Sequence, residues 1–244
     1  MTEETPRIEV TVAAPVETVW AALRDKEKIR HWHGWEYEGT EGGLDQEIDL
    51  IFFTAFTEDA DALTLELQGG DRFVVEPADG GSKITLTRAP HGDDPEWDAY
   101  YDDITEGWTT FIQQLRFALE HHPDEPRRTL FYSGAGDRST GPAEQLGLAG
   151  LAEGTQYGVE LVGEQATGRV WFRSEHQVGV TVDGWGDGLL ILSHVGVSEQ
   201  KPRGATMAVL TLYGVEDAAR ESIDKRWSDW WSMRYPSLEE PGKD

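Results

Sequence analysis

Two stretches of the 244-residue chain carry apolar residues at four corresponding positions a fixed distance apart, and this internal correspondence most constrains the fold. ITEGWTTFI begins at Ile104 and IDKRWSDWW begins at Ile223, an offset of 223 − 104 = 119 residues. Each stretch places aromatic and aliphatic residues at helical spacing, which indicates a helix with one apolar face. The correspondence predicts two domains of one plan, each closed by a long helix. Two unrelated amphipathic helices would give a similar pattern.

A linker signal lies between the two matching stretches. The segment HHPDEPRR, residues 121–128, carries two prolines among charged residues. Proline in such a stretch ends a preceding helix and starts a new segment. We therefore expect a first domain over residues 1–122 and a second, more divergent domain over residues 127–238.

The first domain has a clear order of expected elements. Ile8, Val10 and Val12 alternate with polar residues, which indicates a strand, and Ala14-Pro15 then opens a helix because proline suits the first turn. The remaining expected elements are a short helix from Lys26 to about His33, strands at Ile48-Leu50-Phe52, Leu63-Leu65-Leu67, Phe73-Val75 and Ile84-Leu86, and a long helix from about Ala99 to His121. Gly-Gly pairs at 42–43, 69–70 and 80–81 are typical of turns.

The second domain repeats this order less clearly. The expected elements are a strand at 129–134, a helix at 141–151, strands at 157–162, 169–173, 178–182, 189–193 and 205–213, and a final helix at about 215–233.

Several phrases of the sequence resemble one known superfamily. These are IEVTVAAPVETVWAAL, IRHWHGW and YYDDITEGWTTFIQQLRFALE, with Ala-Pro before a Val-Trp helix, Trp32 after the second helix, and Gly107, Trp108, Ile112 and Leu115 on the closing helix. They are similar to the SRPBCC (START-like) superfamily and, within it, to bacterial relatives of the activator of Hsp90 ATPase homologue family. The resemblance covers residues 7–121. The chain departs from the family at His33-Gly34-Trp35, where a small, proline-containing turn is common.

The resemblance implies an α+β fold of two helix-grip domains. Each would be a curved antiparallel sheet wrapped around a long C-terminal helix, with a cavity between them. Relatives hold lipids, sterols or polyketides in this cavity, some act as cyclases or aromatases, and others bind a chaperone. Such motifs identify a fold more than a function.

Aromatic and aliphatic residues of the first domain are the candidate ligand-binding set, because small-molecule pockets are lined mostly by hydrophobic side chains. The candidates are Leu50, Phe52, Leu65, Phe73, Leu86, Trp108, Ile112 and Leu115, with Trp32 and Trp35 at the rim. The same residues would form an ordinary core if the cavity were filled. In the second domain, three tryptophans on the final helix are expected to fill most of the interior.

The stretch HWHGWEYEG, residues 31–39, concentrates histidines, tryptophans and acids. On a helix, His31 and His33 would point about 200° apart and could not share a metal. On an extended segment they could share one face, with Glu36 and Glu38 as further ligands. We favour a turn with aromatic packing and no metal, in which His33 is a weak candidate for acid–base chemistry at the pocket mouth.

Composition excludes several classes of function. The formal charge of −25 argues against nucleic acid and against anionic membrane surfaces. The absence of cysteine excludes disulfides, thiolate metal sites and a thiol nucleophile. No apolar run approaches the roughly 18 residues of a membrane span, and the N-terminus has no apolar signal core. These features favour a cytoplasmic, acidic protein.

The sequence contains neither a Gly-x-Ser-x-Gly elbow nor an HExxH motif. We therefore expect the chain to bind an apolar or aromatic small molecule without covalent catalysis and without a cofactor. Two alternatives remain: a cyclase- or aromatase-like enzyme acting in the same cavity, and an interaction protein with a chaperone as partner. The ligand and the oligomeric state do not follow from the sequence.

Overall fold

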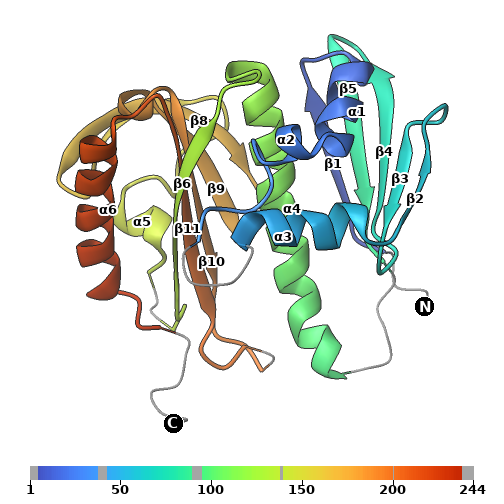
Figure 1. Cartoon of the computed structure of the whole chain (residues 1–244). Coiled ribbons are helices and arrows are strands. Elements are labelled where there is room, and N and C mark those ends of the chain that lie inside the picture. The colour runs from blue at the N-terminus through green and yellow to red at the C-terminus, as the bar shows by residue number, and fades with distance from the viewer. Residues whose placement is uncertain (1–4, 38–42, 90–94, 138–139, 200, 238–244) are drawn as a thin grey trace. The chain divides into compact units, whose positions relative to one another are not determined.

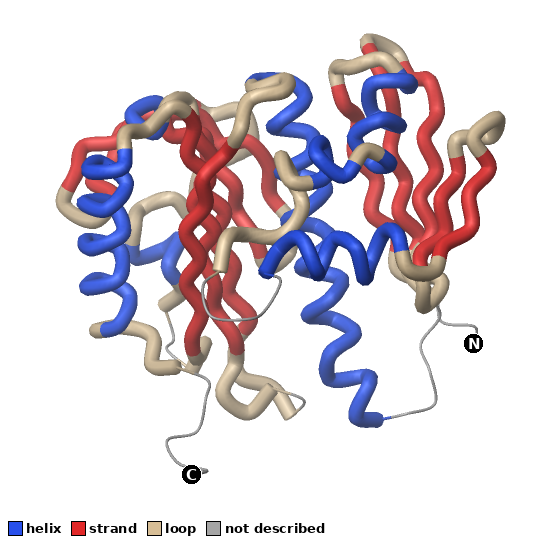
Figure 2. Tube along the Cα trace, viewed as in Figure 1, coloured by secondary structure: helices blue, strands red, loops and turns tan. Residues whose placement is uncertain are grey.

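The computed structural model divides the chain into two compact units, Met1–Pro126 and Arg127–Asp244. It describes residues 5–37, 43–89, 95–137, 140–199 and 201–237, and for residues 95–103 the backbone alone. Each unit is an antiparallel sheet with helices beside it, shown in red and blue in Figure 2, which confirms the predicted α+β class. Within the described residues, no helix has the length and apolar character needed to cross a membrane.

Unit 1 is built on a five-stranded sheet with the order β1-β5-β4-β3-β2 (Figure 1). Its strands are β1 (Arg7–Val12), β2 (Phe56–Asp59), β3 (Thr64–Leu67), β4 (Arg72–Ala78) and β5 (Gly81–Thr87). Its helices are α1 (Val16–Arg24), α2 (Lys26–Ile29), α3 (Gly43–Ile48), a π-helical turn η1 (Asp49–Phe53) and α4 (Pro95–His121). The predicted order is present apart from residues 48–52, with α2 shorter than expected and α3 and β2 unforeseen.

The core of unit 1 lies between one face of the sheet and the helices. Inward side chains alternate along the strands, as in Val10 and Val12 of β1 or Phe73 and Val75 of β4. The buried apolar residues of α1 and α4 pack against them. The apolar alternation in the sequence therefore identified the inward face of these strands.

The predicted strand at Ile48-Leu50-Phe52 is wrong, because these residues form the end of α3 and the turn η1. Ile48 and Phe52 are fully buried, whereas Leu50 is 58% exposed. The packed residues include Leu44, Ile48, Ile51 and Phe52, which follow the i, i+4, i+7, i+8 spacing of a helix. The apparent period of two came from counting Leu50 as an inward residue.

Unit 2 is built on a six-stranded sheet with the order β6-β11-β10-β9-β8-β7. Its strands are β6 (Arg127–Gly134), β7 (Gln156–Leu161), β8 (Glu164–Arg173), β9 (Gln177–Val182), β10 (Gly188–Val195) and β11 (Ala205–Tyr213). Its helices are α5 (Pro142–Gln145), a 3-10 turn η2 (Asp183–Trp185) and α6 (Asp217–Ser232). The predicted helix over 141–151 is wrong in length. It ends near Leu146 because Gly147 adopts a φ of +73°, outside the helical region.

The two units share one topology. In each, the first strand pairs antiparallel with the last, and the remaining strands follow in order across the sheet; unit 2 adds β7 at the far edge. Three of the four matched helix positions also share burial, as Trp108 and Trp227 do, whereas Ile104 is half-buried and Ile223 is buried. Shared topology and shared burial both support two copies of one plan.

Candidate functional site

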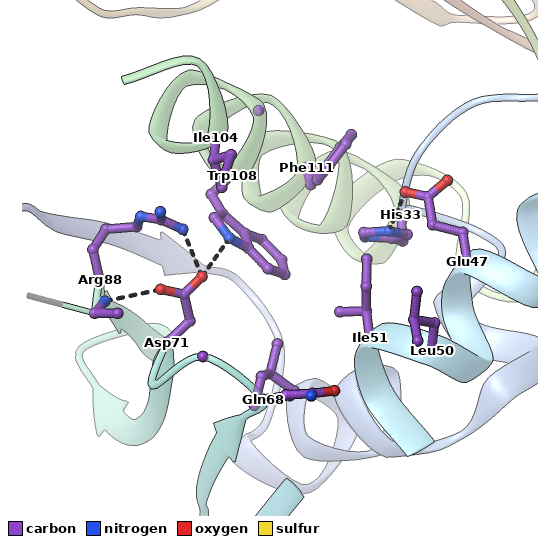
Figure 3. A pocket seen from close by; sticks show the side chains of 14 residues that line it. His33, Glu47, Leu50, Ile51, Gln68, Asp71, Arg88, Ile104, Trp108 and Phe111 are labelled. Carbon is purple, nitrogen blue, oxygen red and sulfur yellow. Dashed lines mark hydrogen bonds and ion pairs between the residues drawn. The ribbon is translucent and has the colours of Figure 1, made fainter. Parts of the chain in front are cut away.

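Unit 1 contains a cavity of about 550 Å³ between α4, the segment α3–η1 and the turn that joins β3 to β4 (Figure 3). Its lining is His33, Glu47, Leu50, Ile51, Leu67, Gln68, Gly69, Asp71, Arg88, Ala89, Ile104, Gly107, Trp108 and Phe111. Most of the side chains in this lining are apolar. The charged and histidine side chains gather at two ends, with Asp71 and Arg88 at one end and His33 and Glu47 at the other, and the polar side chain of Gln68 lies between them.

One face of α4 forms a wall of the cavity. Ile104, Gly107, Trp108 and Phe111 follow the i, i+3, i+4, i+7 spacing, so their side chains share that face. Among the described side chains, a Cβ atom added at Gly107 would have only Phe111 Cε2 nearby, at 3.9 Å. The glycine therefore leaves open space in the middle of this wall.

The segment α3–η1 forms a second wall through Glu47, Leu50 and Ile51, which lie at i, i+3 and i+4. Two ion pairs attach its outer side to α2. Arg30 donates to both oxygens of Asp45, with Nε–Oδ1 at 2.5 Å and Nη2–Oδ2 at 2.8 Å, and this pairing lowers the pKa of Asp45. Lys26 Nζ donates to Asp49 Oδ1 at 2.6 Å.

Asp71, Arg88 and Trp108 form a hydrogen-bonded cluster at one end of the cavity (Figure 3). Asp71 Oδ2 accepts from Arg88 Nη1 at 2.5 Å and from Trp108 Nε1 at 2.8 Å, while Oδ1 accepts from the backbone N–H of Ala89 at 2.9 Å. The Arg88 side chain is only 3% exposed. Both carboxylate oxygens are thus engaged, and the charges of Asp71 and Arg88 offset each other.

The turn before β4 explains where Asp71 lies. Gly69 and Gly70 have φ values of +96° and +94°, which side chains with a Cβ rarely adopt. The backbone N–H of Leu67 donates to the carbonyl of Asp71 at 2.9 Å and closes the turn. The Gly-Gly signal thus predicted the turn, and the turn positions the carboxylate beside the end of β5.

His33 and Glu47 form the polar pair at the other end. His33 Nε2 lies 3.2 Å from Glu47 Oε1, and because a carboxylate only accepts, Nε2 carries the proton in this hydrogen bond. The imidazole is fully buried against aromatic rings, with centroids at 4.6 Å for Phe111 and 5.1 Å for Phe52. The Glu47 side chain is 33% exposed. The pair joins a buried ring to a carboxylate at the cavity wall.

Gly34 allows this pair to form. It has a φ of +59°, and a Cβ there would lie 2.7 Å from Leu44 Cδ1, on the first turn of α3. The chain after His33 thus passes directly against α3, which brings Glu47 within reach of the imidazole. The stretch HWHGWEYEG joins α2 to the next helix, and its Glu38 and Gly39 lie outside the described residues.

The structure separates the predicted site residues into two groups. Leu50, Trp108 and the weak candidate His33 line the cavity. Phe52, Leu65, Phe73, Leu86, Ile112 and Leu115 are fully buried in the core and are absent from the lining. Trp32 is also in the core, where its Nε1 donates to the carbonyl of Ala22 at 2.8 Å, and Trp35 contacts Phe111 with a centroid distance of 5.9 Å.

Sequence reasoning missed Glu47, Asp71 and Arg88. A helical interpretation of residues 43–53 would have placed Glu47 on the same face as Leu50 and Ile51. Asp71 and Arg88 are 17 residues apart and meet only through the pairing of β4 with β5. For these two the sequence carried no local signal.

Unit 2 has a smaller hollow, of about 180 Å³, beside α5 and the adjacent ends of β8, β9 and β10. Glu144, Arg173, His176 and His194 are among the residues that line it, and no residue of α6 is. Burial lowers the pKa of His194, opposed by nearby Glu144 and assisted by His176. Between α6 and the sheet, aromatic rings pack together, including Trp185 against Trp227 and Trp231 against Tyr235.

The histidines His31 and His33 do not meet in one site. His31 lines a separate small hollow with Lys28 and His122, away from Glu47. In the part of the chain that the structure describes, no three His, Asp or Glu side chains are grouped closely enough to hold a metal ion.

Comparison with known proteins gave matches among solved structures alone: no protein-family profile and no curated protein matches the chain. DynU16, a protein in the dynemicin biosynthetic locus, is 17% identical, with 93% of this chain and 94% of that chain covered and a TM-score of 0.34. The di-domain ARO/CYC BexL from the BE-7585A biosynthetic pathway is 13% identical over 98% and 100% of the two chains, with a TM-score of 0.37. The Aha1 dimer from Colwellia psychrerythraea is 14% identical over 49% and 98%, with a TM-score of 0.35. Likenesses this low assign neither a family nor an activity to the chain.

Proposed function

We propose that unit 1 binds an apolar small molecule in the cavity between α4 and α3–η1. The observation that carries this proposal is an open space of about 550 Å³ with a mostly apolar lining. This volume falls within the roughly 300–1,000 Å³ typical of small-molecule sites. The sequence resemblance to the SRPBCC superfamily, whose members hold apolar molecules in a helix-grip cavity, supports the same function.

The free energy of binding would come from apolar surface removed from water, at about 25 cal/mol per Å². Trp108 and Phe111 offer aromatic surface on one wall, and Leu50 and Ile51 offer aliphatic surface on the other. A flat ligand of two or three fused rings would contact both walls.

Filling the cavity from its own wall tests the proposal. Leucine in place of Gly107 would project into the open space without a backbone clash, because its Cβ has one neighbour in the described part of the chain, at 3.9 Å. Native mass spectrometry of the freshly purified protein, beside the same sample denatured, would detect a bound molecule. Calorimetric titration with naphthylmethanol, a neutral two-ring probe, would measure binding directly.

Wild type and Gly107→Ala are expected to bind the probe. Gly107→Leu is expected to bind at least about tenfold more weakly, a loss of about 1.4 kcal/mol, because the leucine side chain would occupy space that the probe needs. The alanine variant is the matched control for a changed helix residue. Equal probe affinity in all three proteins, or no binding in wild type, would contradict the proposal.

The His33–Glu47 pair favours a second candidate function, an enzyme of the cyclase or aromatase kind. A carboxylate at an apolar cavity wall, held by a buried imidazole at 3.2 Å, can remove a proton from a bound carbon acid. His33 would then position Glu47 and stabilise its charge.

Proton exchange at carbon tests this candidate without knowledge of the natural substrate. β-Tetralone, a two-ring ketone with acidic C–H bonds, would be incubated with the protein in deuterated water and followed by NMR. A positioned general base accelerates such exchange by roughly 10²–10⁴-fold. Glu47→Gln should abolish the acceleration. Exchange no faster than in buffer would remove the enzyme candidate and leave binding untouched.

A further inference from the structure

We propose that the unit 1 cavity selects cationic or hydrogen-bond-donating apolar ligands over anionic ones, with Glu47 as the group that makes the choice. The preferred class is an aromatic or alkyl amine, followed by a neutral alcohol or phenol. This inference rests on the proposed binding function, and it adds the chemical class of the ligand.

The first observation is the bonding of Glu47. Its hydrogen-bond partner among the described residues is His33, which contacts Oε1 at 3.2 Å. Oε2 has no hydrogen-bond donor within the described part of the chain. The side chain lines the cavity and is partly exposed. Oε2 of Glu47 can therefore accept a hydrogen bond from a ligand in the cavity.

The second observation is the hydrogen bonding at the other end of the cavity, where Asp71 and Arg88 lie. Both oxygens of Asp71 already accept hydrogen bonds from Arg88, Trp108 and Ala89. Arg88 is the only lysine or arginine among the described residues that line the cavity, and its charge is engaged with Asp71 at 2.5 Å. An anionic ligand would have to break this buried pair to find a cation, which is costly. Among the described lining residues, an anion therefore finds neutral donors such as the amide of Gln68, but no available counter-charge comparable to that of Glu47.

The third observation is the aromatic wall beside Glu47. The ring centroids of Phe111 and Trp108 are 6.0 Å apart, and both side chains line the cavity. A cation over an aromatic face is stabilised by the ring quadrupole. A carboxylate next to such faces is the arrangement that recognises an ammonium group on an apolar body. The formal charge of −25 on the whole chain acts in the same direction, because it repels anions.

Three probes that share one ring system and differ in their polar group test the selection. They are naphthylmethylamine, naphthylmethanol and naphthoic acid, titrated calorimetrically into the full chain at physiological salt. At about pH 8 an ordinary imidazole is neutral, the amine keeps its proton and the acid is ionised. The expected order of affinity is amine, then alcohol, then acid, with the amine at least about tenfold tighter than the acid, as for a hydrogen bond to a charged group.

Two variants distinguish the effect of the Glu47 carboxylate from the effect of the protein's overall negative charge. Glu47→Gln keeps the shape and an acceptor for His33 but removes one negative charge. Asp49→Asn removes one negative charge two positions away, on a side chain that does not line the cavity. Glu47→Gln should weaken the amine about three- to tenfold and leave the alcohol within about twofold, after allowance for partial exposure. Asp49→Asn should change all three probes by less than about twofold.

The possible results distinguish the two proposals. If none of the probes binds wild type, the binding function itself is overturned. If the acid binds as tightly as the amine, or more tightly, the selection is overturned while the binding function stands. If the amine binds best but Glu47→Gln and Asp49→Asn weaken it equally, Glu47 has no special role and the inference is overturned. Loss of all binding in Gly107→Leu would place the probes in this cavity.

Discussion

Trp108 on α4 and Asp71 before β4 are joined by a hydrogen bond of 2.8 Å from the indole N–H to a carboxylate oxygen that also binds Arg88. The bond ties the closing helix to the sheet at one end of the cavity. Trp108 therefore acts both as wall and as anchor, and its ring also meets Phe73 edge-on at a centroid distance of 5.3 Å. The shape of the cavity at this end depends on a charged cluster that is almost fully buried.

Removing the Asp71 charge should destabilise unit 1 strongly. Asp71→Asn takes the counter-charge from an Arg88 side chain that is 3% exposed. Breaking a buried ion pair from one side typically costs about 3–5 kcal/mol. Urea unfolding followed by tryptophan fluorescence would measure the loss. The double variant Asp71→Leu/Arg88→Met should lose much less than the sum of its single changes, and simple additivity would contradict a coupled pair.

Gly107→Ala should stabilise the protein. Gly107 lies in the interior of α4, and of the side chains that the structure describes an added Cβ meets only Phe111, with Cε2 at 3.9 Å. Alanine loses less backbone entropy than glycine, which is worth about 0.5–1 kcal/mol in a helix. The melting temperature measured by circular dichroism should rise. A fall would mean that the methyl group is crowded where the structure shows open space.

Gly34→Ala should disturb the junction between His33 and α3. The residue has a φ of +59°, and the new Cβ would lie 2.7 Å from Leu44 Cδ1. Positive-φ strain costs about 1–2 kcal/mol, and the contact with Leu44 adds to it. Gly43→Ala is the matched control, because Gly43 has a φ of +50° and a Cβ added there has no described atom within 4 Å. Similar losses of unfolding free energy in both variants would show that the contact with Leu44 is unimportant.

The free energy of unfolding should fall as the pH is lowered, because of the titration of His194. Burial lowers its pKa in the folded protein below the ordinary value of 6.5. Below that value the unfolded chain binds a proton that the folded chain does not, so the free energy of unfolding falls as pH falls. At a pH above that value, His194 is neutral in both the folded and the unfolded chain, and it no longer makes the free energy of unfolding depend on pH. The slope in this window is at most about 1.4 kcal/mol per pH unit for one proton.

His194→Phe provides the comparison, since it keeps a ring against Gly141 and removes the titration. The groups around His194 are Glu144 on α5, which raises its pKa, and His176 after β8, which lowers it. Urea unfolding at several pH values between about 7 and 5 should give a shallower slope for the variant than for wild type. Identical slopes would mean that His194 takes up its proton freely in the folded state.

The sequence predicted the α+β class and most elements because their apolar residues recur with one clear period. The face of α4 that carries Ile104, Trp108 and Phe111 is an example. Residues 48–52 were misread because Leu50, an exposed apolar residue, completed a false alternation. Exposed leucines are common on folded proteins, so a short apolar pattern cannot by itself distinguish strand from helix.

The candidate site was less predictable than the fold. Apolar residues such as Phe73, Leu86 and Ile112 give the same sequence pattern whether they line a cavity or fill a core. In this protein they fill the core. The polar ends of the cavity depend on pairs that are distant in sequence. Asp71 lies 37 residues from Trp108, and Glu47 lies 14 residues from His33 across a connection whose path the sequence does not reveal.

The shared topology of the two units supplies an internal reference for spectroscopy. Trp108 and Trp227 hold matching positions in matching helices, one beside an open cavity and the other within packed aromatic rings. A molecule that enters the cavity changes the surroundings of Trp108, whereas a change of solvent or temperature acts on both indoles. In protein labelled with fluorotryptophan, the chemical shift of Trp108 relative to that of Trp227 would measure how much of the cavity is occupied. The Trp227 resonance would serve as the internal control, and no substitution would be needed.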